Sequence, residues 1–315
     1  MTTARIDEAA ETLVIAGAGQ RPTTAELIGP RARVDARVTG GGKTWKATFP
    51  LRASRWGGPE LPLPTGDYEL RIAGAEFGDL LIAPEVLAGV RIAVDGATVR
   101  IAAPIDPAYE TSEGQATLEG RYVAHPGATE NAVFFESFYG RTVGCNPQAI
   151  DRALFAQAPD VVRYWSVVDL SVAVPDGAIA VVEGSPEWWR ARAASRLLVV
   201  NDWLRRRFVR KPGQKVLQTW HGTPLKRLAL HRPGFDPRRM AAVVKESRRW
   251  DVLLAQNTYS ERILRKAYAF FGRPIWVEGY PRNDALVTGD AAGIRGDLGI
   301  ADGERVLLYL SLIHI

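Results

Sequence analysis

Segments of strand length and of helix length alternate through the second half of the chain, and this alternation limits the fold more than any other feature. Compact apolar runs, expected as strands, occupy residues 132–137, 163–168, 178–182, 196–201, 215–220, 252–256 and 275–279. Helix-start signals lie between them at Asn146-Pro147 and Ser185-Pro186, and further helices are expected near 237–247 and 260–270. This alternation predicts a parallel, doubly wound sheet of the α/β class.

The first 126 residues have a different pattern and predict a small all-β domain. From about residue 20 to 125, polar and apolar residues alternate in short runs at 31–38, 44–49, 68–72, 90–94 and 98–101. Asp95-Gly96 separates the last two runs and is typical of a hairpin turn. Short alternating strands with turn-rich connections favour a β-sandwich, and residues 125–130 form the expected linker to the α/β part.

Length and composition describe a chain that can hold more than one folded core. With 315 residues, it is long enough for two domains. Its one cysteine, Cys145, excludes an internal disulfide framework and fits a reducing compartment. No apolar run reaches the roughly 18 residues needed to span a bilayer, and the N-terminus lacks the pattern of a secretory signal.

Charge is distributed unevenly along the chain. Residues 1–130 carry 13 Lys and Arg against 17 Asp and Glu, a net charge of −4. Residues 201–250 carry 14 against 3, a net charge of +11. This basic block is either an ordinary solvated surface or a region that attracts polyanions or anionic lipid head groups.

A short run contains the strongest functional signal: Gln218-Thr219-Trp220-His221-Gly222-Thr223-Pro224-Leu225-Lys226. His221 is expected at the carboxyl end of a strand, where open α/β sheets face their ligands. Thr223 is a good N-cap and Pro224 a good first helical residue, so the run predicts a helix start that favours anions such as phosphate. The alternative is a histidine that is buried and satisfied at a strand end. His231 and His125 lack this context and are interpreted as surface residues.

Two other motifs follow strands of the same predicted sheet. Phe135-Glu136-Ser137-Phe138-Tyr139-Gly140-Arg141 comes after the first strand, and Gly279-Tyr280-Pro281-Arg282-Asn283-Asp284 after the last. The carboxyl ends of parallel strands share one edge, so all three motifs are expected to line one crevice. Each motif also has a simpler explanation: Glu136 pairs with an arginine, Arg282 is a surface charge, and the glycine and proline form an ordinary turn.

Together with Asn146-Pro147, these motifs resemble the CDP-glycerol glycerophosphotransferases, the wall teichoic acid primases and polymerases. The resemblance covers about residues 131–310 and leaves out the β-rich region. It implies a two-lobed GT-B fold, in which two Rossmann-like halves face each other across a cleft. It also implies transfer of glycerol phosphate, or a related polyol phosphate, from a CDP-polyol donor to a hydroxyl of a lipid-linked polyol-phosphate acceptor. CMP is released, and neither a metal nor another cofactor is expected.

The resemblance also implies roles for individual residues. His221 matches the catalytic base of the family, which takes the proton of the acceptor hydroxyl as that hydroxyl attacks the β-phosphorus of the donor. Substrate-binding roles are implied for Glu136, Ser137, Gly222, Thr223, Pro224, Lys226, Arg282, Asn283 and Asp284.

The sequence departs from the family in two ways. Members usually have an aspartate where this chain has Cys145, so a role for that loop is not carried over. The family also continues into a second, nucleotide-binding lobe, whereas this chain enters one more expected strand at 305–309 and then loses the resemblance. We therefore expect a β-sandwich domain at 1–126, an acceptor lobe at 131–298 and the start of a missing donor lobe at 299–315, as in a truncated or frame-disrupted product. Negligible activity is expected of this fragment alone, and His314 is not expected to be the family's second catalytic histidine.

Other functions fit the same residues. A GT-B glycosyltransferase using a nucleotide sugar would share the sheet, although the Trp-His-Gly-Thr-Pro run favours phosphotransfer. A non-catalytic polyanion-binding protein would use the basic runs, but no nucleic-acid motif accompanies them, and nucleic acid is not an expected partner. The residues concerned are Arg205-Arg206-Arg207, Arg210-Lys211 and Arg248-Arg249, with Trp203 and Trp250 for stacking. A better use of the block is docking to an anionic membrane surface, which predicts a peripheral protein on the cytoplasmic face of the cell membrane.

Overall fold

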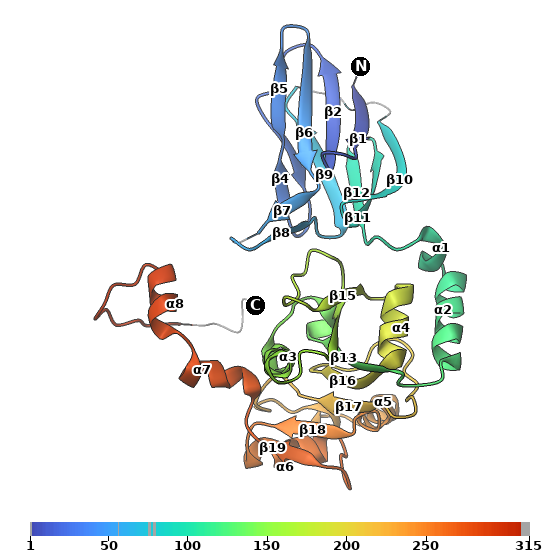
Figure 1. The fold of residues 1–315 in the computed structure, drawn as a ribbon, viewed down its shortest axis with the longest axis vertical. Coiled ribbons are helices and arrows are strands. Elements are labelled where there is room, and N and C mark those ends of the chain that lie inside the picture. Colours follow the sequence, from blue (N-terminus) through green and yellow to red (C-terminus); the bar gives the residue numbers. More distant parts are fainter. Residues whose placement is uncertain (1, 56, 75–76, 78–79, 310–315) are drawn as a thin grey trace.

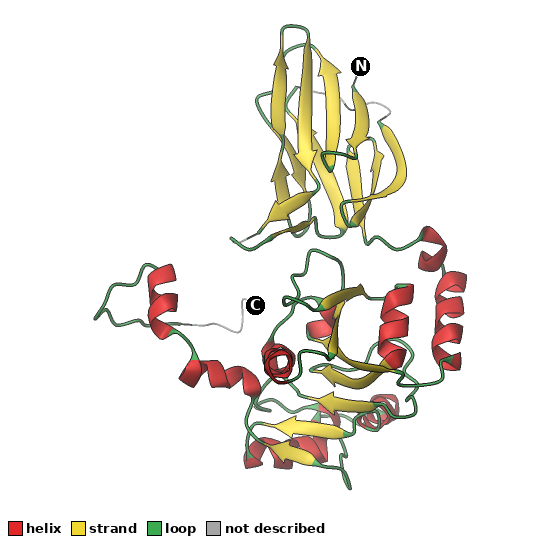
Figure 2. Ribbon diagram, in the orientation of Figure 1, coloured by secondary structure: helices red, strands yellow, loops and turns green. Residues whose placement is uncertain are grey.

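Two bodies of different architecture make up the protein. The computed structural model describes residues 2–55, 57–74, 77 and 80–309. Figure 1 shows a body of strands at the N-terminal end and a layered body of strands and helices below it. Figure 2 shows the helices lying around and beside the lower sheet, while the upper body is drawn as strands and loops. The predicted fold class, an α/β lobe preceded by a small all-β sandwich, is confirmed.

A sheet of seven parallel strands forms the centre of the lobe, in the order β15-β14-β13-β16-β17-β18-β19. The chain begins in the middle at β13, adds β14 and β15 on one side, and then returns to add β16 through β19 on the other. Such a reversal puts a ligand-binding switch point beside the loops that follow β13 and β16. The strands are β13 (Glu130–Glu136), β14 (Val162–Val167), β15 (Ile179–Val182), β16 (Ser195–Val200), β17 (Lys215–Gln218), β18 (Val252–Ala255) and β19 (Ile275–Val277).

Helices cover both faces of this sheet because its strands present apolar side chains to both sides. Phe134 lies in one buried cluster with Trp188 and Leu264, whereas Phe135 belongs to a separate cluster with Trp165. Each large side chain buried in this way contributes roughly 1.5–3 kcal/mol. The helices beside the sheet are α2 (Ser112–Ala124), α3 (Cys145–Gln157), α4 (Pro186–Ala194), α5 (Pro237–Ser247) and α6 (Thr258–Ala267), with short 3₁₀ turns η1 (Phe138–Gly140), η2 (Ala229–His231) and η3 (Pro281–Asp284). Two further helices, α7 (Ala285–Thr288) and α8 (Ala291–Asp297), bury no residue and extend away from the sheet in Figure 1.

Two antiparallel sheets form the upper body, in the orders β1-β2-β6-β5 and β10-β11-β12-β9-β3-β4. Their inner faces share one core, to which Phe49 contributes from one sheet and Leu70 from the other. Along β9, Tyr68, Leu70 and Ile72 are buried while the residues between them are exposed, as the alternation predicted. The strands are β1 (Thr3–Asp7), β2 (Thr12–Ala18), β3 (Ala25–Ile28), β4 (Arg33–Asp35), β5 (Arg37–Gly41), β6 (Thr44–Pro50), β9 (Gly66–Ile72), β10 (Leu81–Leu87), β11 (Val90–Asp95) and β12 (Thr98–Ala102), with a separate pair, β7 (Arg52–Ser54) and β8 (Glu60–Pro62).

The expectation that residues 20–125 are all-β is wrong at its end. After β12 the chain forms α1 (Pro107–Glu110) and then α2, whose first turn is capped by the hydroxyl of Thr111. Leu118 and Tyr122, one helical turn apart, are buried in the core of the lobe. The helix therefore forms because it covers the sheet of the lobe, an interaction that the local alternation does not reveal. The division of the chain at residues 126 and 298 stays a prediction.

The strand expected at 305–309 is also wrong. These residues are irregular, and the side chain of Leu307 is 97% exposed. A strand needs a neighbour for its backbone hydrogen bonds, and none of the strands in the described part of the chain pairs with this segment. Residues 310–315, which include His314, lie outside the described residues. None of the helices described is both long enough and apolar enough to cross a membrane.

The buried carboxylate of Asp169 connects the sandwich to the lobe. Asp169 follows β14 and pairs with Arg31 of the sandwich, while the backbone N–H and the hydroxyl of Thr65 donate to it at 3.0 and 2.9 Å. Ser171 donates to its other oxygen through both its N–H and its hydroxyl. Burial raises the pKa of Asp169, but the hydrogen bonds from Ser171, Thr65 and Arg31 outweigh it and set the pKa below its usual value.

Replacing this carboxylate should loosen the contact between the two bodies. Asp169→Asn is expected to lower the free energy of unfolding by about 1–3 kcal/mol at neutral pH, since it removes charge-assisted bonds but leaves Arg31 partly exposed. The folded pKa lies below the unfolded value of about 3.9, so the stabilisation is present above that pH and is lost as pH falls through the folded pKa. Thermal unfolding across pH measures both effects.

The control for this experiment is Asp160→Asn, which removes an exposed carboxylate. The melting temperatures of wild type and Asp169→Asn should converge only when the pH falls below the folded pKa of Asp169, which itself lies below about 3.9. Equal stability at pH 7, or a difference that does not change at low pH, would contradict the role of Asp169.

Candidate active site at the carboxyl edge of the sheet

His221 lies just past the end of β17, as predicted, in a turn that polar contacts hold in place. Gln218 accepts from the N–H of Trp220 at 2.9 Å, and Trp220 adopts a left-handed backbone conformation with φ of 55°. The buried amide of Asn146 donates to the carbonyls of Thr219 and Trp220 at 3.2 and 3.1 Å. The position of the imidazole is therefore fixed by side chains from its own strand and from α3.

One nitrogen of the imidazole is engaged and the other is available. Nδ1 of His221 lies 2.7 Å from the carbonyl oxygen of Asn201, the residue that follows β16. A carbonyl only accepts, so Nδ1 carries the proton and Nε2 of the neutral ring is left as the acceptor. The side chain is 34% exposed, which excludes the alternative of a fully buried, structural histidine.

A carboxylate lies beside the engaged nitrogen. Oδ1 of Asp202 is 3.9 Å from Nδ1 of His221. Burial raises the pKa of Asp202, while the charges of His221 and Arg205 act in the opposite direction. A carboxylate at this distance stabilises the imidazolium that forms when Nε2 takes a proton. Asn201 and Asp202 were not predicted, although both directly follow a strand at the same edge of the sheet.

Aromatic rings fix the plane of the imidazole. The ring of Trp220 stacks on it with centroids 4.8 Å apart, and the ring of Phe138 lies 5.7 Å away. The N–H of Phe138 donates to the side-chain oxygen of Asn201 at 2.9 Å, so the loops after β13, β16 and β17 are joined around His221.

The loop after β19 joins the same group. One guanidinium nitrogen of Arg282, NH1, donates to the carbonyl of His221 at 2.8 Å and to the sulfur of Cys145 at 2.9 Å. The hydroxyl of Tyr280 donates to the carbonyl of Gly222 at 3.0 Å, and burial raises the pKa of Tyr280 to about 12, which keeps this donor protonated. The loops that carry the three motifs therefore meet at one edge of the sheet, as predicted, and Arg282 is not an ordinary surface charge. The crevice that all three are expected to line stays a prediction.

Other predicted binding residues support the loops rather than face His221. The carboxyl of Glu136 is 5% exposed and accepts from Ser166 at 2.7 Å; burial raises its pKa, against the hydrogen bond from Ser166 and the charge of Arg192. The hydroxyl of Ser137 donates to the carbonyl of Gly144. Asn283 and Asp284 lie in η3, and neither side chain bonds to His221 within the described residues. Their binding roles stay predictions.

The predicted helix start after Gly222 is wrong. The hydroxyl of Thr223 donates to the side chain of Gln256 at 2.6 Å and does not cap a helix. Residues 223–228 are irregular, Pro224 is buried in the turn, and the next regular element is η2. The row of free N–H groups expected to attract phosphate is therefore absent from this described segment. Exposed cations, Lys226 and Arg227, follow His221 in the chain, and Arg282 contacts its carbonyl.

The arrangement has the parts of a general base beside a cationic group. Nε2 of His221 can accept a proton, and the carbonyl of Asn201 holds the opposite nitrogen. The carboxylate of Asp202 lies 3.9 Å from that nitrogen, and the guanidinium of Arg282 adds positive charge nearby. Within the described ranges, no group of three or more His, Cys, Asp or Glu side chains is arranged to hold a metal ion.

Comparisons with known proteins identify the family of this chain. The family described as CDP-Glycerol:Poly(glycerophosphate) glycerophosphotransferase matches residues 120–310. A teichoic acid poly(glycerol phosphate) polymerase of Bacillus subtilis (strain 168) is 36% identical over 190 residues, which are 56% of this chain and 25% of the relative. A teichoic acid glycerol-phosphate transferase of Staphylococcus aureus (strain NCTC 8325 / PS 47) is 30% identical over 205 residues, 57% of this chain and 49% of the relative.

Solved structures of the wall teichoic acid polymerase TagF share the fold. One matches with a TM-score of 0.55 and 29% identity, covering 61% of this chain and 51% of TagF. Another, a histidine-to-asparagine variant soaked with CDPG, matches with a TM-score of 0.53 and 28% identity, covering 60% and 54%. The chain spans about half, or less, of the length of these relatives. The chain belongs to the CDP-glycerol:poly(glycerophosphate) glycerophosphotransferase family.

Proposed function

We propose that this lobe takes part in transferring glycerol phosphate, or a related polyol phosphate, from a CDP-polyol to a hydroxyl of a lipid-linked polyol-phosphate acceptor. The acceptor oxygen forms a bond to the β-phosphorus of the donor, and the bond from that phosphorus to the oxygen of CMP breaks. The proton of the hydroxyl passes to Nε2 of His221, and CMP leaves. The observation that carries the proposal is the 2.7 Å contact that fixes Nδ1 and leaves Nε2 as the acceptor.

Neighbouring residues supply positioning and charge. Positioning and electrostatic stabilisation account for most of phosphoryl transfer. NH1 of Arg282 is anchored to two loops, while its Nε and NH2 bond to no described residue and are available to a phosphate oxygen. Lys226 adds a second positive charge on the loop after His221.

The contacts of the basic residues weaken one of the two alternative functions, the non-catalytic polyanion-binding protein. Arg205 and Arg206 pair with Glu183, and Lys211 is buried against backbone carbonyls. Trp250 is fully buried and cannot stack on a base. These contacts argue against a polyanion-binding protein built on the basic runs. A nucleotide-sugar glycosyltransferase would use the same sheet, and membership of the phosphotransferase family favours phosphotransfer.

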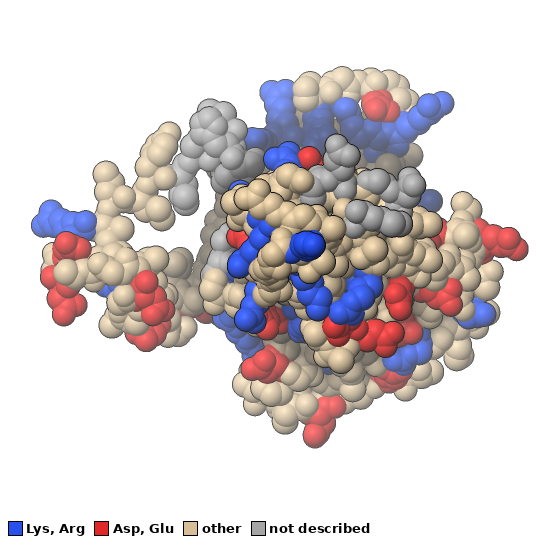
Figure 3. Space-filling view, turned by 90° about the horizontal axis from the view of Figure 1, so that it is seen from above, with Lys and Arg blue, Asp and Glu red and all other residues tan. Residues whose placement is uncertain are grey.

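We further propose that the loop after His221 docks on an anionic membrane surface, which would place the lobe at the cytoplasmic face of the cell membrane. In the docking loop, defined as residues 225–238, Leu225 is 83% exposed and Phe235 is 85% exposed. Its exposed basic residues are Lys226, Arg227, Arg232 and Arg238. Apolar side chains that enter the interface, with cations that attract acidic head groups, are typical of peripheral membrane proteins. Figure 3, which views the molecule from the sandwich end, shows both Lys and Arg and Asp and Glu on that face.

The role of His221 is tested by removing the imidazole. In a complete enzyme that carries this lobe, His221→Ala should reduce CMP release from CDP-glycerol by on the order of a hundredfold or more, as expected for a general base. His231→Ala is the matched control, because His231 lies in η2 of the same loop region and is expected to keep activity. Nearly unchanged turnover in His221→Ala would refute the proposed base.

Asp202 offers a test that separates chemistry from folding. Asp202→Asn should lower kcat on the order of tenfold with KM retained, since the imidazolium loses a neighbouring negative charge. Burial raises the pKa of Asp202 above its unfolded value, so at pH 7 the ionised carboxylate destabilises the folded state. The neutral amide of Asp202→Asn should therefore not lower the melting temperature at pH 7. Calorimetry and turnover are measured together, and a loss of activity that parallels a loss of stability would contradict the proposal.

Membrane docking is tested by flotation with vesicles. Leu225→Ser with Phe235→Ser should reduce binding to vesicles that contain anionic lipid by more than tenfold, because each apolar side chain contributes roughly 1.5–3 kcal/mol on full burial. Leu286→Ser with Val287→Ser removes equally exposed apolar side chains from α7 and is the control. Equal binding of the wild-type chain to neutral vesicles would rule out electrostatic docking.

A further inference from the structure

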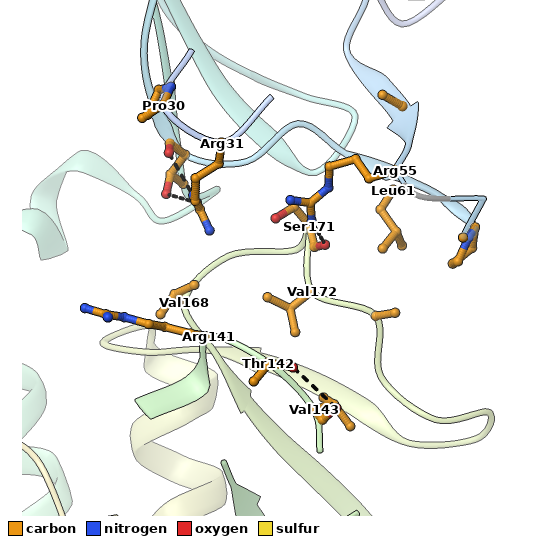
Figure 4. A pocket seen from close by; sticks show the side chains of 15 residues that line it. Pro30, Arg31, Arg55, Leu61, Arg141, Thr142, Val143, Val168, Ser171 and Val172 are labelled. Carbon is orange, nitrogen blue, oxygen red and sulfur yellow. Dashed lines mark hydrogen bonds between the residues drawn. The ribbon is translucent and has the colours of Figure 1, made fainter. Parts of the chain in front are cut away.

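A cavity of about 1100 Å³ lies between the β-sandwich and the lobe. Figure 4 shows Arg31 and Arg55 coming down from the sandwich, opposite Thr142, Val143 and Val172 of the lobe. The volume lies just above the range for pockets that hold small ligands, about 300–1,000 Å³. It therefore has room for more than one unit of a repeating ligand.

The lining of the cavity is cationic. It includes Arg31, Arg55 and Arg141, and no Asp or Glu is among the described residues that line it. The guanidinium of Arg55 donates to the carbonyl of Ser171 at 2.7 Å. The guanidinium of Arg31 donates to Thr65 and to the buried carboxylate of Asp169. The side chain of Arg141 is exposed and bonds to no described residue. Guanidinium groups suit phosphate oxygens. Figure 4 shows the side chain of Arg141 extending outward at the edge of the cavity, away from Arg55 and Val143, where it would meet a ligand that runs past that edge.

Aliphatic side chains form the rest of the lining. Leu61 comes from the sandwich, while Val143, Val168 and Val172 come from the loops after β13 and β14. A ligand that alternates phosphates with short carbon segments would contact both kinds of surface.

The cavity shares a loop with the candidate active site. In the loop after β13, the ring of Phe138 lies 5.7 Å from the ring of His221, and Arg141 follows three residues later in the wall of the cavity. The hydroxyl of Ser137 bonds to the carbonyl of Gly144 and closes this loop at its base. Residues of this one loop therefore contact the imidazole and also line the cavity.

We propose that this cavity binds the phosphodiester backbone of a polyol-phosphate acceptor chain, behind the end whose hydroxyl reaches His221. This assignment rests on the proposed function, because it identifies the acceptor as an extended polyol phosphate. Arg141 and Arg55 contact the phosphates, and the valines contact the carbon segments between them.

The test measures binding of a short synthetic glycerol-phosphate oligomer to the 315-residue chain by isothermal titration calorimetry. Arg141→Gln should weaken binding about tenfold, because one charge-assisted contact is lost, and Arg141→Lys should recover part of the affinity. Arg152→Gln, which removes an exposed arginine on α3 outside the cavity, should bind like wild type. Unchanged affinity in Arg141→Gln, or equally tight binding of a polyglutamate of the same charge, would overturn the assignment.

A further variant separates this proposal from the proposed function. His221→Ala in the same chain should change the affinity for the oligomer far less than Arg141→Gln does, because the imidazole meets only the terminal hydroxyl and lies outside the cavity. If the wild-type chain does not bind the oligomer, the cavity assignment fails whatever the transfer assay gives. If the oligomer binds through Arg141 while His221→Ala keeps full turnover in the complete enzyme, the catalytic proposal fails and the cavity assignment stands.

Discussion

The buried amide of Asn146 is the interaction on which the candidate site depends. Its nitrogen donates to the carbonyls of Thr219 and Trp220, and its oxygen lies 3.4 Å from the N–H of Arg282. One side chain thus joins α3 to the turn before His221 and to the loop after β19. A fully buried amide is costly unless its donors and acceptor are bonded, so moving any of these loops would leave a buried polar group without a partner. This cost keeps the imidazole in one position, which a general base requires.

The sequence alone predicted those parts of the structure that follow from the spacing of apolar residues and from the order of strands and helices along the chain. Apolar runs of strand length predicted the strands of the parallel sheet, and parallel strands put the loops carrying Phe138, His221 and Arg282 at one edge. The contacts between those loops were not predictable, because they join residues far apart in the chain. Asn201 and Asp202 were overlooked although the same rule applies to them, since they follow β16 directly.

Local signals failed where a tertiary partner competed with them. Thr223 and Pro224 have the composition of a helix start, but the hydroxyl of Thr223 bonds to Gln256 on the neighbouring strand's loop, and the chain continues without a helix. The reverse occurs in α2, where the alternating pattern of the preceding region suggested more strand. In α2, Leu118 and Tyr122 are buried against the lobe, and this burial stabilises the helix. In both cases the decisive energy comes from residues distant in sequence.

The contact between the two bodies explains how a sandwich without a recognisable catalytic set can matter to the chemistry. The carboxylate of Asp169, held by Ser171 in the loop after β14, fixes Arg31 and Thr65 of the sandwich above the carboxyl edge of the sheet. This places one wall of a cationic cavity next to the loop that also carries Phe138 against His221. The partners of His221, namely Asn201, Asp202 and Phe138, all belong to the lobe, whereas the walls of the cavity come from both bodies. On the proposed assignment, the sandwich would therefore help to hold the acceptor chain without touching the histidine.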